Sequence, residues 1–267
     1  MENPVSRKWW DPLTLRDGIW YRWFLLGAEV LVCRKKNHWH GLCKDRYWRD
    51  RTGECTGPEE AESCSRGTVL FSSGPEDPSA ALRPLLPVKP FLLTFSWGLR
   101  LSPETELALD LELPFLLRLS TVKDRQAGEP VFTFKPFVVN ETWYGDTAME
   151  GLLCLSLNPD RPLDGPVEDA PENPRQTLRC RALLRNRAKT TVSLDRLPLL
   201  ADQFSIYENH GELVTDTPVF DIFGSGEFRM NFASPDHTGL LVPGSKNGVG
   251  EMLIYHGTRI IKDITRH

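Results

Sequence analysis

Cysteine and histidine residues are concentrated near the start of the sequence, and both residue types bind metal ions. Four of the six cysteines fall within residues 33–64, together with two histidines. Cys33, His38, His40 and Cys43 form the closest group, and thiolate and imidazole ligands of this kind can hold zinc in tetrahedral geometry. No Cys-x-x-Cys pair occurs among them. We therefore expect free thiols and no cofactor, with zinc at these four residues as the alternative.

Two consecutive aromatic residues in the middle of the chain are candidates for ligand binding. Trp143 and Tyr144 precede Gly145 and Asp146, an order typical of a strand end at which a ring is exposed. We therefore assign Trp143, Tyr144 and Asp146 to a ligand-binding site. Packing of the two rings in a seam between domains is the alternative, and large aromatic side chains generally favour such burial.

Pairs of carboxylates are the remaining candidates for catalysis, because a glycosidase needs two carboxylates facing each other across a cleft. Asp221 with Glu227, or Glu141 with Asp146, could form such a pair only if the fold brings them together. The sequence contains no nucleophile elbow, phosphate-binding loop or helical histidine pair. We therefore expect no catalysis through a recognised motif.

Alternating apolar and polar residues predict strands as the elements that position these candidates. The odd-numbered residues from Phe91 to Leu101 are all apolar, and the same period of two continues from Leu107 to Leu113. A short polar turn containing Pro103 separates the two runs, so we expect an antiparallel hairpin. Its odd-numbered residues, Trp97 included, should face the core. Helical periodicity is not sustained anywhere in the chain.

A stretch rich in proline and acidic residues divides the sequence. Residues 159–176 contain almost no aliphatic side chains, a composition that favours an exposed linker. We therefore expect an all-β protein of two antiparallel β-sandwich-like domains with little helix. The first is a β-rich domain over residues 1–158 with a Trp/Cys-rich start, and the second is an immunoglobulin-like sandwich over residues 177–267.

Composition and charge narrow the functional classes. The chain is 40% hydrophobic and 25% charged with a net charge of −4, as expected for a folded soluble protein. The basic residues 1–51 hold six of the eight tryptophans, which could stack on nucleic-acid bases, but the acidic remainder makes nucleic acid an unfavourable partner. The longest apolar run, Trp23–Cys33, is too short to span a membrane. We expect a cytoplasmic protein.

Several short motifs resemble those of a known family. The motifs are Leu86-Pro87-Val88-Lys89-Pro90, Trp143-Tyr144-Gly145-Asp146, Gly151-Leu152-Leu153-Cys154, the run from Arg185 to Leu197, and Phe204-Ser205-Ile206-Tyr207. In this order, over residues 85–232, they resemble a mostly archaeal family of uncharacterised proteins, the domain of unknown function 432. The resemblance implies no activity, cofactor or catalytic residue.

The all-β pattern, the missing motifs and the resemblance together favour a non-catalytic module that binds a partner or has a structural role. Its partner would be a protein or a small-molecule ligand, and neither a membrane nor a nucleic acid. The alternative is a metal-dependent or hydrolytic enzyme that uses the Cys/His group or a carboxylate pair. The oligomeric state stays open.

Overall fold

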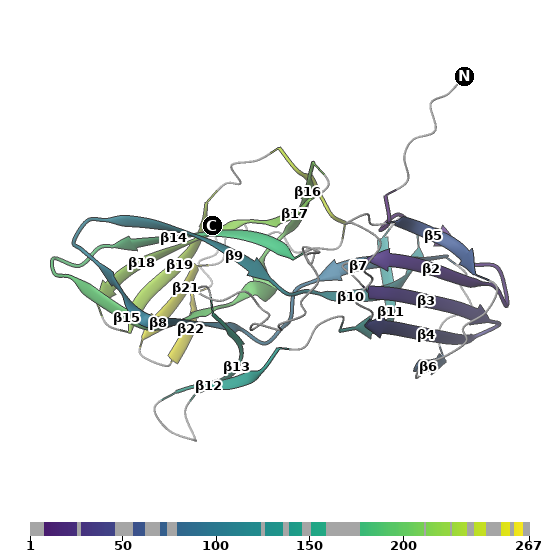
Figure 1. Cartoon of the computed structure of the whole chain (residues 1–267), viewed down its shortest axis with the longest axis horizontal. Helices are drawn as coiled ribbons and strands as arrows, with labels where there is room; N and C mark the ends of the chain where they lie inside the picture. The colour runs from purple at the N-terminus through teal and green to yellow at the C-terminus, as the bar shows by residue number, and fades with distance from the viewer. Residues whose placement is uncertain are drawn as a thin grey trace, which may run out of the picture.

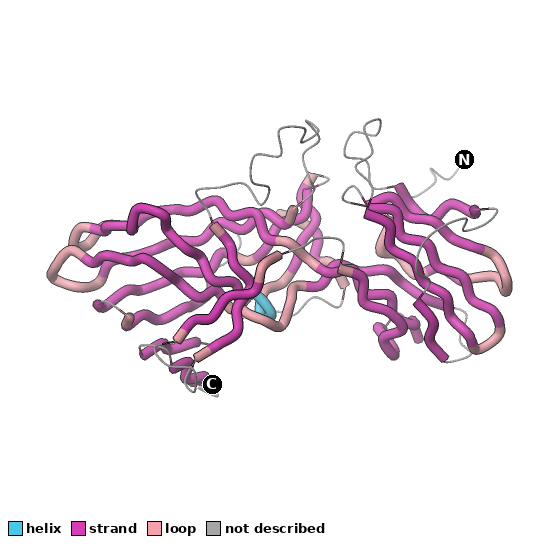
Figure 2. Tube along the Cα trace, turned by 60° about the horizontal axis from the view of Figure 1, so that its bottom comes forward, coloured by secondary structure: helices cyan, strands magenta, loops and turns pink. Residues whose placement is uncertain are grey.

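The fold is nearly all strand, which confirms the expected all-β class. The computed structural model describes residues 8–25, 28–45, 56–61, 70–73, 79–123, 126–135, 139–145, 151–158, 177–210, 212–224, 226–233, 238–243, 252–256 and 259–263. Within these residues the single helical element is the short 3-10 turn η1 (Ala201–Gln203), drawn in cyan in Figure 2. Most of the described strand pairs are antiparallel, and three are parallel.

Two sheets form the unit at the right of Figure 1, which we call the first sandwich. One has the strand order β5-β2-β3-β4-β6 and the other β1-β7-β10-β11. The bounds are β1 (Leu13–Thr14), β2 (Trp20–Leu25), β3 (Ala28–Lys35), β4 (His38–Asp45), β5 (Thr56–Ala61), β6 (Leu70–Ser73), β7 (Ser79–Leu85), β10 (Leu116–Lys123) and β11 (Gln126–Phe134). The two sheets approach closely at Gly41, where an added Cβ atom would lie 2.7 Å from the ring of Phe132.

The remaining strands form the second sandwich, at the left of Figure 1. One sheet has the order β12-β13-β8-β15, and the other runs β20-β16-β17-β14-β18-β19-β21-β22 with β9 also paired to β14. The bounds are β8 (Phe91–Leu101), β9 (Glu106–Leu113), β12 (Glu141–Tyr144), β13 (Leu152–Leu157), β14 (Leu178–Asn186), β15 (Val192–Leu199), β16 (Ile206–Asn209), β17 (Glu212–Thr215), β18 (Thr217–Gly224), β19 (Glu227–Ala233), β20 (Leu240–Leu241), β21 (Met252–His256) and β22 (Arg259–Asp263). A continuous core of buried apolar side chains includes residues of both sandwiches.

The two runs expected to form a hairpin do not pair with each other. β8 pairs with β15 in one sheet, whereas β9 pairs with β14 in the other. The turn after Leu101 therefore carries the chain from sheet to sheet, and the turn after Asn186 does the same in reverse. The hairpin prediction is wrong because a period of two fixes which face of a strand is buried, not which strand lies beside it.

Strand pairing also joins segments on either side of residues 159–176, the expected linker. β8 and β9 precede that stretch, yet their hydrogen-bonded partners β15 and β14 follow it. The same two strands lie in sequence between β7 and β10, which pair with each other in the first sandwich. Residues 159–176 themselves lie outside the described residues.

Alternation correctly predicts the buried face of most central strands and fails at one tryptophan. Leu178, Cys180, Ala182 and Leu184 of β14 are all buried, as expected. Trp97 was expected in the core but is 94% exposed. The β8–β15 register jumps from Thr94–Arg196 to Leu99–Leu194, so four residues of β8 bulge opposite a single residue of β15.

In the part of the chain that the structure describes, no helix is long and apolar enough to cross a membrane.

Candidate functional site

The structure does not bring all four proposed zinc ligands to one place. Cys33 and His40 lie directly opposite each other on β3 and β4, so their side chains share a sheet face, and His38 lies on that face two residues away. Cys43 is an odd number of residues from His40, and it packs against the apolar core on the other face. Among the described residues no group of three or more His, Cys, Asp or Glu side chains could hold a metal ion.

Three of the described cysteines, Cys33, Cys154 and Cys180, are free thiols with little thiolate character. Burial raises the pKa of Cys33, raises that of Cys154 to about 11, and raises that of Cys180 to about 12. Only the thiolate is a good nucleophile or metal ligand, so these three sulfurs are inert near neutral pH. His40 shows the matching effect, because burial and then the nearby Lys35 and His38 lower its pKa.

The two aromatic candidates point to opposite faces of their strand. Trp143 is 40% exposed at the end of β12, where its ring lies against Gly151. Tyr144 is buried, with the guanidinium carbon of Arg196 5.6 Å from its ring centroid. Adjacent strand residues cannot form one flat binding surface. Asp146, the third residue of this group, lies outside the described residues.

Two of the three described carboxylates that were candidates for catalysis, Glu141 and Asp221, are held by cations. Glu141 accepts a hydrogen bond from Lys89 Nζ at 2.5 Å, and this bond is the largest cause of a lowered Glu141 pKa. Asp221 accepts a 2.9 Å hydrogen bond from Arg187 Nε. Carboxylates held ionised in this way are poor general acids. Glu227 lies at the start of β19, and its register partner is Gly224 rather than Asp221.

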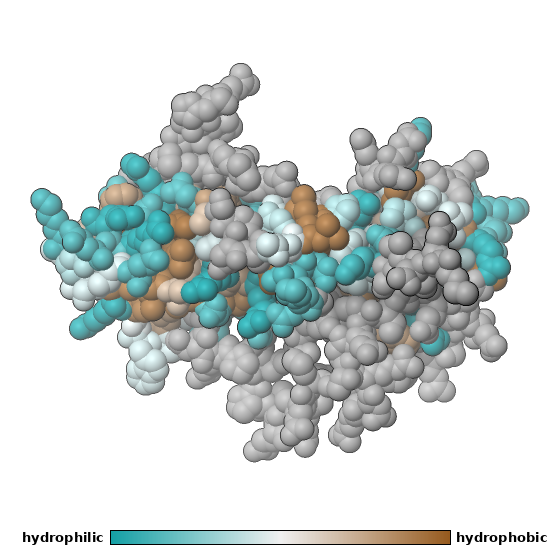
Figure 3. All heavy atoms as spheres, turned by 90° about the horizontal axis from the view of Figure 1, so that it is seen from above, coloured by the Kyte–Doolittle hydropathy of each residue, from teal (hydrophilic) through white to brown (hydrophobic). Residues whose placement is uncertain are grey.

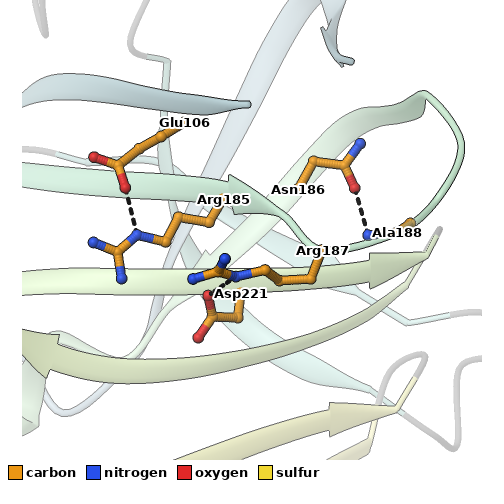
Figure 4. Close-up of polar contacts among 6 residues, drawn as sticks. All are labelled: Glu106, Arg185, Asn186, Arg187, Ala188 and Asp221. Atoms are coloured by element: carbon orange, nitrogen blue, oxygen red, sulfur yellow. Dashed lines mark hydrogen bonds and ion pairs between the residues drawn. The ribbon is translucent and has the colours of Figure 1, made fainter. Parts of the chain in front are cut away.

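Instead, the structure assembles a polar cluster at the free end of the second sandwich, where the β8–β9 and β14–β15 turns meet. We call it the turn cluster, and Figure 4 shows it. Its centre is Asn186, which is 1% exposed. The Asn186 Nδ2 group donates to the carbonyl oxygens of Leu101, Ser102 and Thr190 at 2.9–3.0 Å, and Oδ1 accepts from the Ala188 amide at 2.8 Å. One side chain thus ties the two turns together.

Ion pairs surround this anchor at the surface. Arg185 Nε lies 2.5 Å from Glu106 Oε2 across the β14–β9 pair, and Arg187 holds Asp221 across to β18. These side chains line part of a shallow hollow of about 350 Å³, whose full lining is Glu104, Thr105, Glu106, Arg185, Asn186 and Arg187. On the face seen in Figure 3, hydrophilic residues dominate this end of the molecule. Because each arginine has a carboxylate partner, the hollow can offer hydrogen bonds without a strong excess of charge.

Trp97 is the exposed residue that sequence reasoning missed. It lies in the β8 bulge next to Gly98, whose φ of +68° is in the left-handed region that favours glycine. An added Cβ at Gly98 would lie 3.1 Å from Asp195 Oδ1. The bulge directs the indole outward instead of into the core. An isolated glycine within an otherwise regular strand is a known bulge signal, so Gly98 could have flagged this position.

Comparisons with known proteins identify a family and nothing more specific. No curated protein and no solved structure matches the chain. The model of a family described as "Protein of unknown function (DUF432)" matches residues 9–240. That span covers most of the chain, including the first sandwich and the second sandwich as far as β19, and extends further toward each end than the motifs that first indicated the resemblance. The chain belongs to the DUF432 family.

Proposed function

We propose that this protein is a non-catalytic binding module that recognises a partner protein through Trp97 and the adjoining end of the second sandwich. The observation that carries the proposal is the 94% exposure of Trp97 within a paired strand. Tryptophan is among the residues most enriched at binding hot spots. In a soluble chain, a side chain of this size normally finds a place in the core.

The surface of Trp97 is large enough to matter energetically. A tryptophan can bury about 150–250 Å² on contact. At about 25 cal/mol per Å², this burial contributes roughly 4–6 kcal/mol before the costs of association are subtracted. The β8 bulge already fixes the backbone beneath the ring, and Asn186 holds the end of the same strand. Less conformational entropy is therefore lost when a partner binds.

The state of the other candidate groups supports binding over catalysis. The described candidate carboxylates Glu141 and Asp221 are ion-paired, and the buried thiols have raised pKa values. Loops and turns at the end of a β-sandwich are a common place for recognition sites. The free thiols of Cys33, Cys154 and Cys180 also favour a reducing compartment, so we place this binding role in the cytoplasm.

Site-specific photo-crosslinking at position 97 tests the proposal, with position 100 as the matched control. Arg100 is exposed on the same strand but lies outside the bulge. A crosslinker at position 97 should capture a defined protein that position 100 does not capture. That protein is then purified, and its affinity for Trp97→Ala should be at least about tenfold weaker than for the wild type.

A second exposed apolar residue controls for general stickiness. Val88 is 76% exposed in the segment before β8, so Val88→Ala removes apolar surface away from the bulge. This variant should bind the captured protein as the wild type does. Equal binding by Trp97→Ala and the wild type, or identical capture from positions 97 and 100, would overturn the proposed function.

A further inference from the structure

Two arginines lie side by side on the first sandwich, far in sequence from Trp97. Arg83 of β7 and Arg118 of β10 are directly opposite each other in the antiparallel register, and Thr133 of β11 is opposite Arg118. Their neighbours Leu82 and Leu117 belong to the apolar core. Because side chains alternate along a strand, both arginines point to the face of the sheet that is turned away from that core.

Arg83 is buried and Arg118 is half-buried, and each has an Nε atom that no described residue hydrogen-bonds. Arg83 is 8% exposed, and the adjacent Ala81 and Ser120 on the same face are also buried. The Nε atoms of Arg83 and Arg118 are both inaccessible to solvent, and neither forms a hydrogen bond. No described carboxylate forms an ion pair with either side chain. Burial alone lowers the pKa of Arg83, the direction expected when a cation loses water and gains no counter-charge.

Another arginine of the same sandwich, whose Nε atom is also inaccessible to solvent, shows how the protein neutralises such a charge. Arg22 of β2 also has an inaccessible Nε atom, but it lies 2.9 Å from Oε1 of the buried Glu29 on β3. The contact is an ion pair, although its angles are not those of a hydrogen bond. A buried guanidinium without an acid is costly, and like charges directly opposite each other on a sheet repel. Arg83 combines both features, and the half-buried Arg118 has the second.

A third cation lies close to the two arginines in the chain trace. Lys135 is the first residue after β11 and follows Thr133, the register partner of Arg118, by two residues. Glu141 interacts electrostatically with Lys135, but its carboxylate is already held by Lys89 at 2.5 Å. The described residues around Arg83 and Arg118 therefore include a third cation, and no described carboxylate pairs with either arginine.

We propose that Arg83 and Arg118 form a binding site for a phosphate dianion, either free phosphate or the phosphate group of a small monoester. Each guanidinium presents a planar fork of N–H donors that matches two oxygens of a tetrahedral oxyanion. A dianion neutralises both arginines, which a single carboxylate does not. Because the Nε atoms are inaccessible to solvent, the Nη groups are the donors that an anion reaches, and the burial of Arg83 makes its charge-assisted bonds stronger than they would be at an exposed site.

Thermal unfolding in the presence of inorganic phosphate tests this site. Phosphate should raise the Tm of the wild type, compared with chloride at equal ionic strength, because a ligand bound only to the folded state stabilises it. Arg83→Met and Arg118→Met should each abolish most of that rise. Calorimetric titration should show phosphate affinity at least about tenfold weaker for each variant. Glycerol phosphate in place of phosphate distinguishes the two sources, since a monoester site should prefer it.

Three controls make the result decisive. Arg179 is an exposed arginine paired with Glu212, so Arg179→Met should keep the full phosphate response. Without phosphate, Arg83→Met should melt no lower than the wild type, because the change removes an unpaired buried charge.

If Arg83→Met fails to fold, Arg118→Met carries the same test. A wild type that does not respond to phosphate, or methionine variants that keep the response, would overturn this proposal. Trp97→Ala should leave the response unchanged, which separates this site from the proposed partner site.

Discussion

Two tryptophans in the middle of paired strands have opposite environments. Trp39 of β4 is completely buried in the core of the first sandwich, whereas Trp97 of β8 is 94% exposed on the second. Polar or small residues flank both, His38 and His40 beside Trp39 and Ser96 and Gly98 beside Trp97, so the immediate neighbours do not distinguish them. Their different positions therefore have a cause outside the local pattern of hydrophobicity.

The cause is the continuity of strand pairing. β4 pairs with β3 without a register shift from Lys35–His38 to Ala28–Asp45, so the face assigned to Trp39 is kept along the whole strand. β8 loses its register with β15 around Trp97, where Gly98 adopts a φ of +68°. A bulge re-aims the side chains within it. Where the register is continuous a tryptophan stabilises the core, and where it is interrupted the same residue becomes available to a partner.

The largest expected effect comes from removing each ring in turn. Trp39→Ala should destabilise the protein by about 3–5 kcal/mol, because it empties a large volume in a packed core. Trp97→Ala should change the free energy of unfolding by no more than about 0.5 kcal/mol, as is usual for exposed positions. Urea unfolding of the two variants measures both values. Similar midpoints for the two variants would show that the indole of Trp97 is packed in solution.

A variant at Asn186 tests whether the contrast between Trp39 and Trp97 depends on the anchored end of β8. Asn186→Ala leaves the carbonyl groups of Leu101, Ser102 and Thr190 without their side-chain donor, so we expect a loss of about 2–3 kcal/mol. Asn140→Ala, at an exposed asparagine, is the matched control and should cost little. Thermal or urea unfolding measures the difference. An Asn186 variant as stable as the control would mean that the turns hold each other without it.

Much of the fold could be predicted from the sequence, because burial on one face of a strand leaves a direct pattern. The buried residues of β14 and the all-β class follow from that pattern. Partner choice leaves no such pattern, since β9 would show the same alternating leucines beside β8 or beside β14. The crossing of β8 and β9 between sheets, and their position between β7 and β10, depend on contacts between segments far apart in sequence.

The candidate sites were harder to predict for the same reason. Cys33 and His40 do share a face, but strand parity places Cys43 on the opposite one, and parity depends on where each strand begins. Arg83 and Arg118 are 35 positions apart in the sequence and become neighbours only through the β7–β10 register. Exposure of Trp97 had one local signal, Gly98, which also fits the polar half of a regular alternation. Local patterns therefore predict strands better than the sites between them.

Gly98→Ala is a milder way to disturb the bulge. An L-residue at a φ of +68° costs about 1–2 kcal/mol, partly offset by lower entropy of the unfolded chain, so we expect a net loss of about 1 kcal/mol. The new Cβ atom would also press on Asp195 Oδ1, an exposed side chain that can move away. Gly224→Ala is the control, because an added Cβ there meets nothing within 4 Å and its φ is not positive. If the two variants were equally stable, the bulge would not require glycine.

The smallest expected effect concerns the residue next to Trp39 on the opposite face of β4. Burial, followed by the charges of Lys35 and His38, lowers the pKa of His40. The unfolded chain therefore binds this proton at a higher pH than the folded protein does. His40 thus contributes stability that is present above about pH 6.5 and is lost as the pH falls through its folded pKa.

His40→Gln should make the free energy of unfolding depend less steeply on pH below about 6.5. The change in slope should correspond to less than one proton bound on unfolding. Urea unfolding at a series of pH values measures this slope, with His210→Asn at an exposed turn as the control. An unchanged slope for His40→Gln would mean that this face of β4 is open to water, and the contrast between the two sides of the strand would then be weaker than the structure indicates.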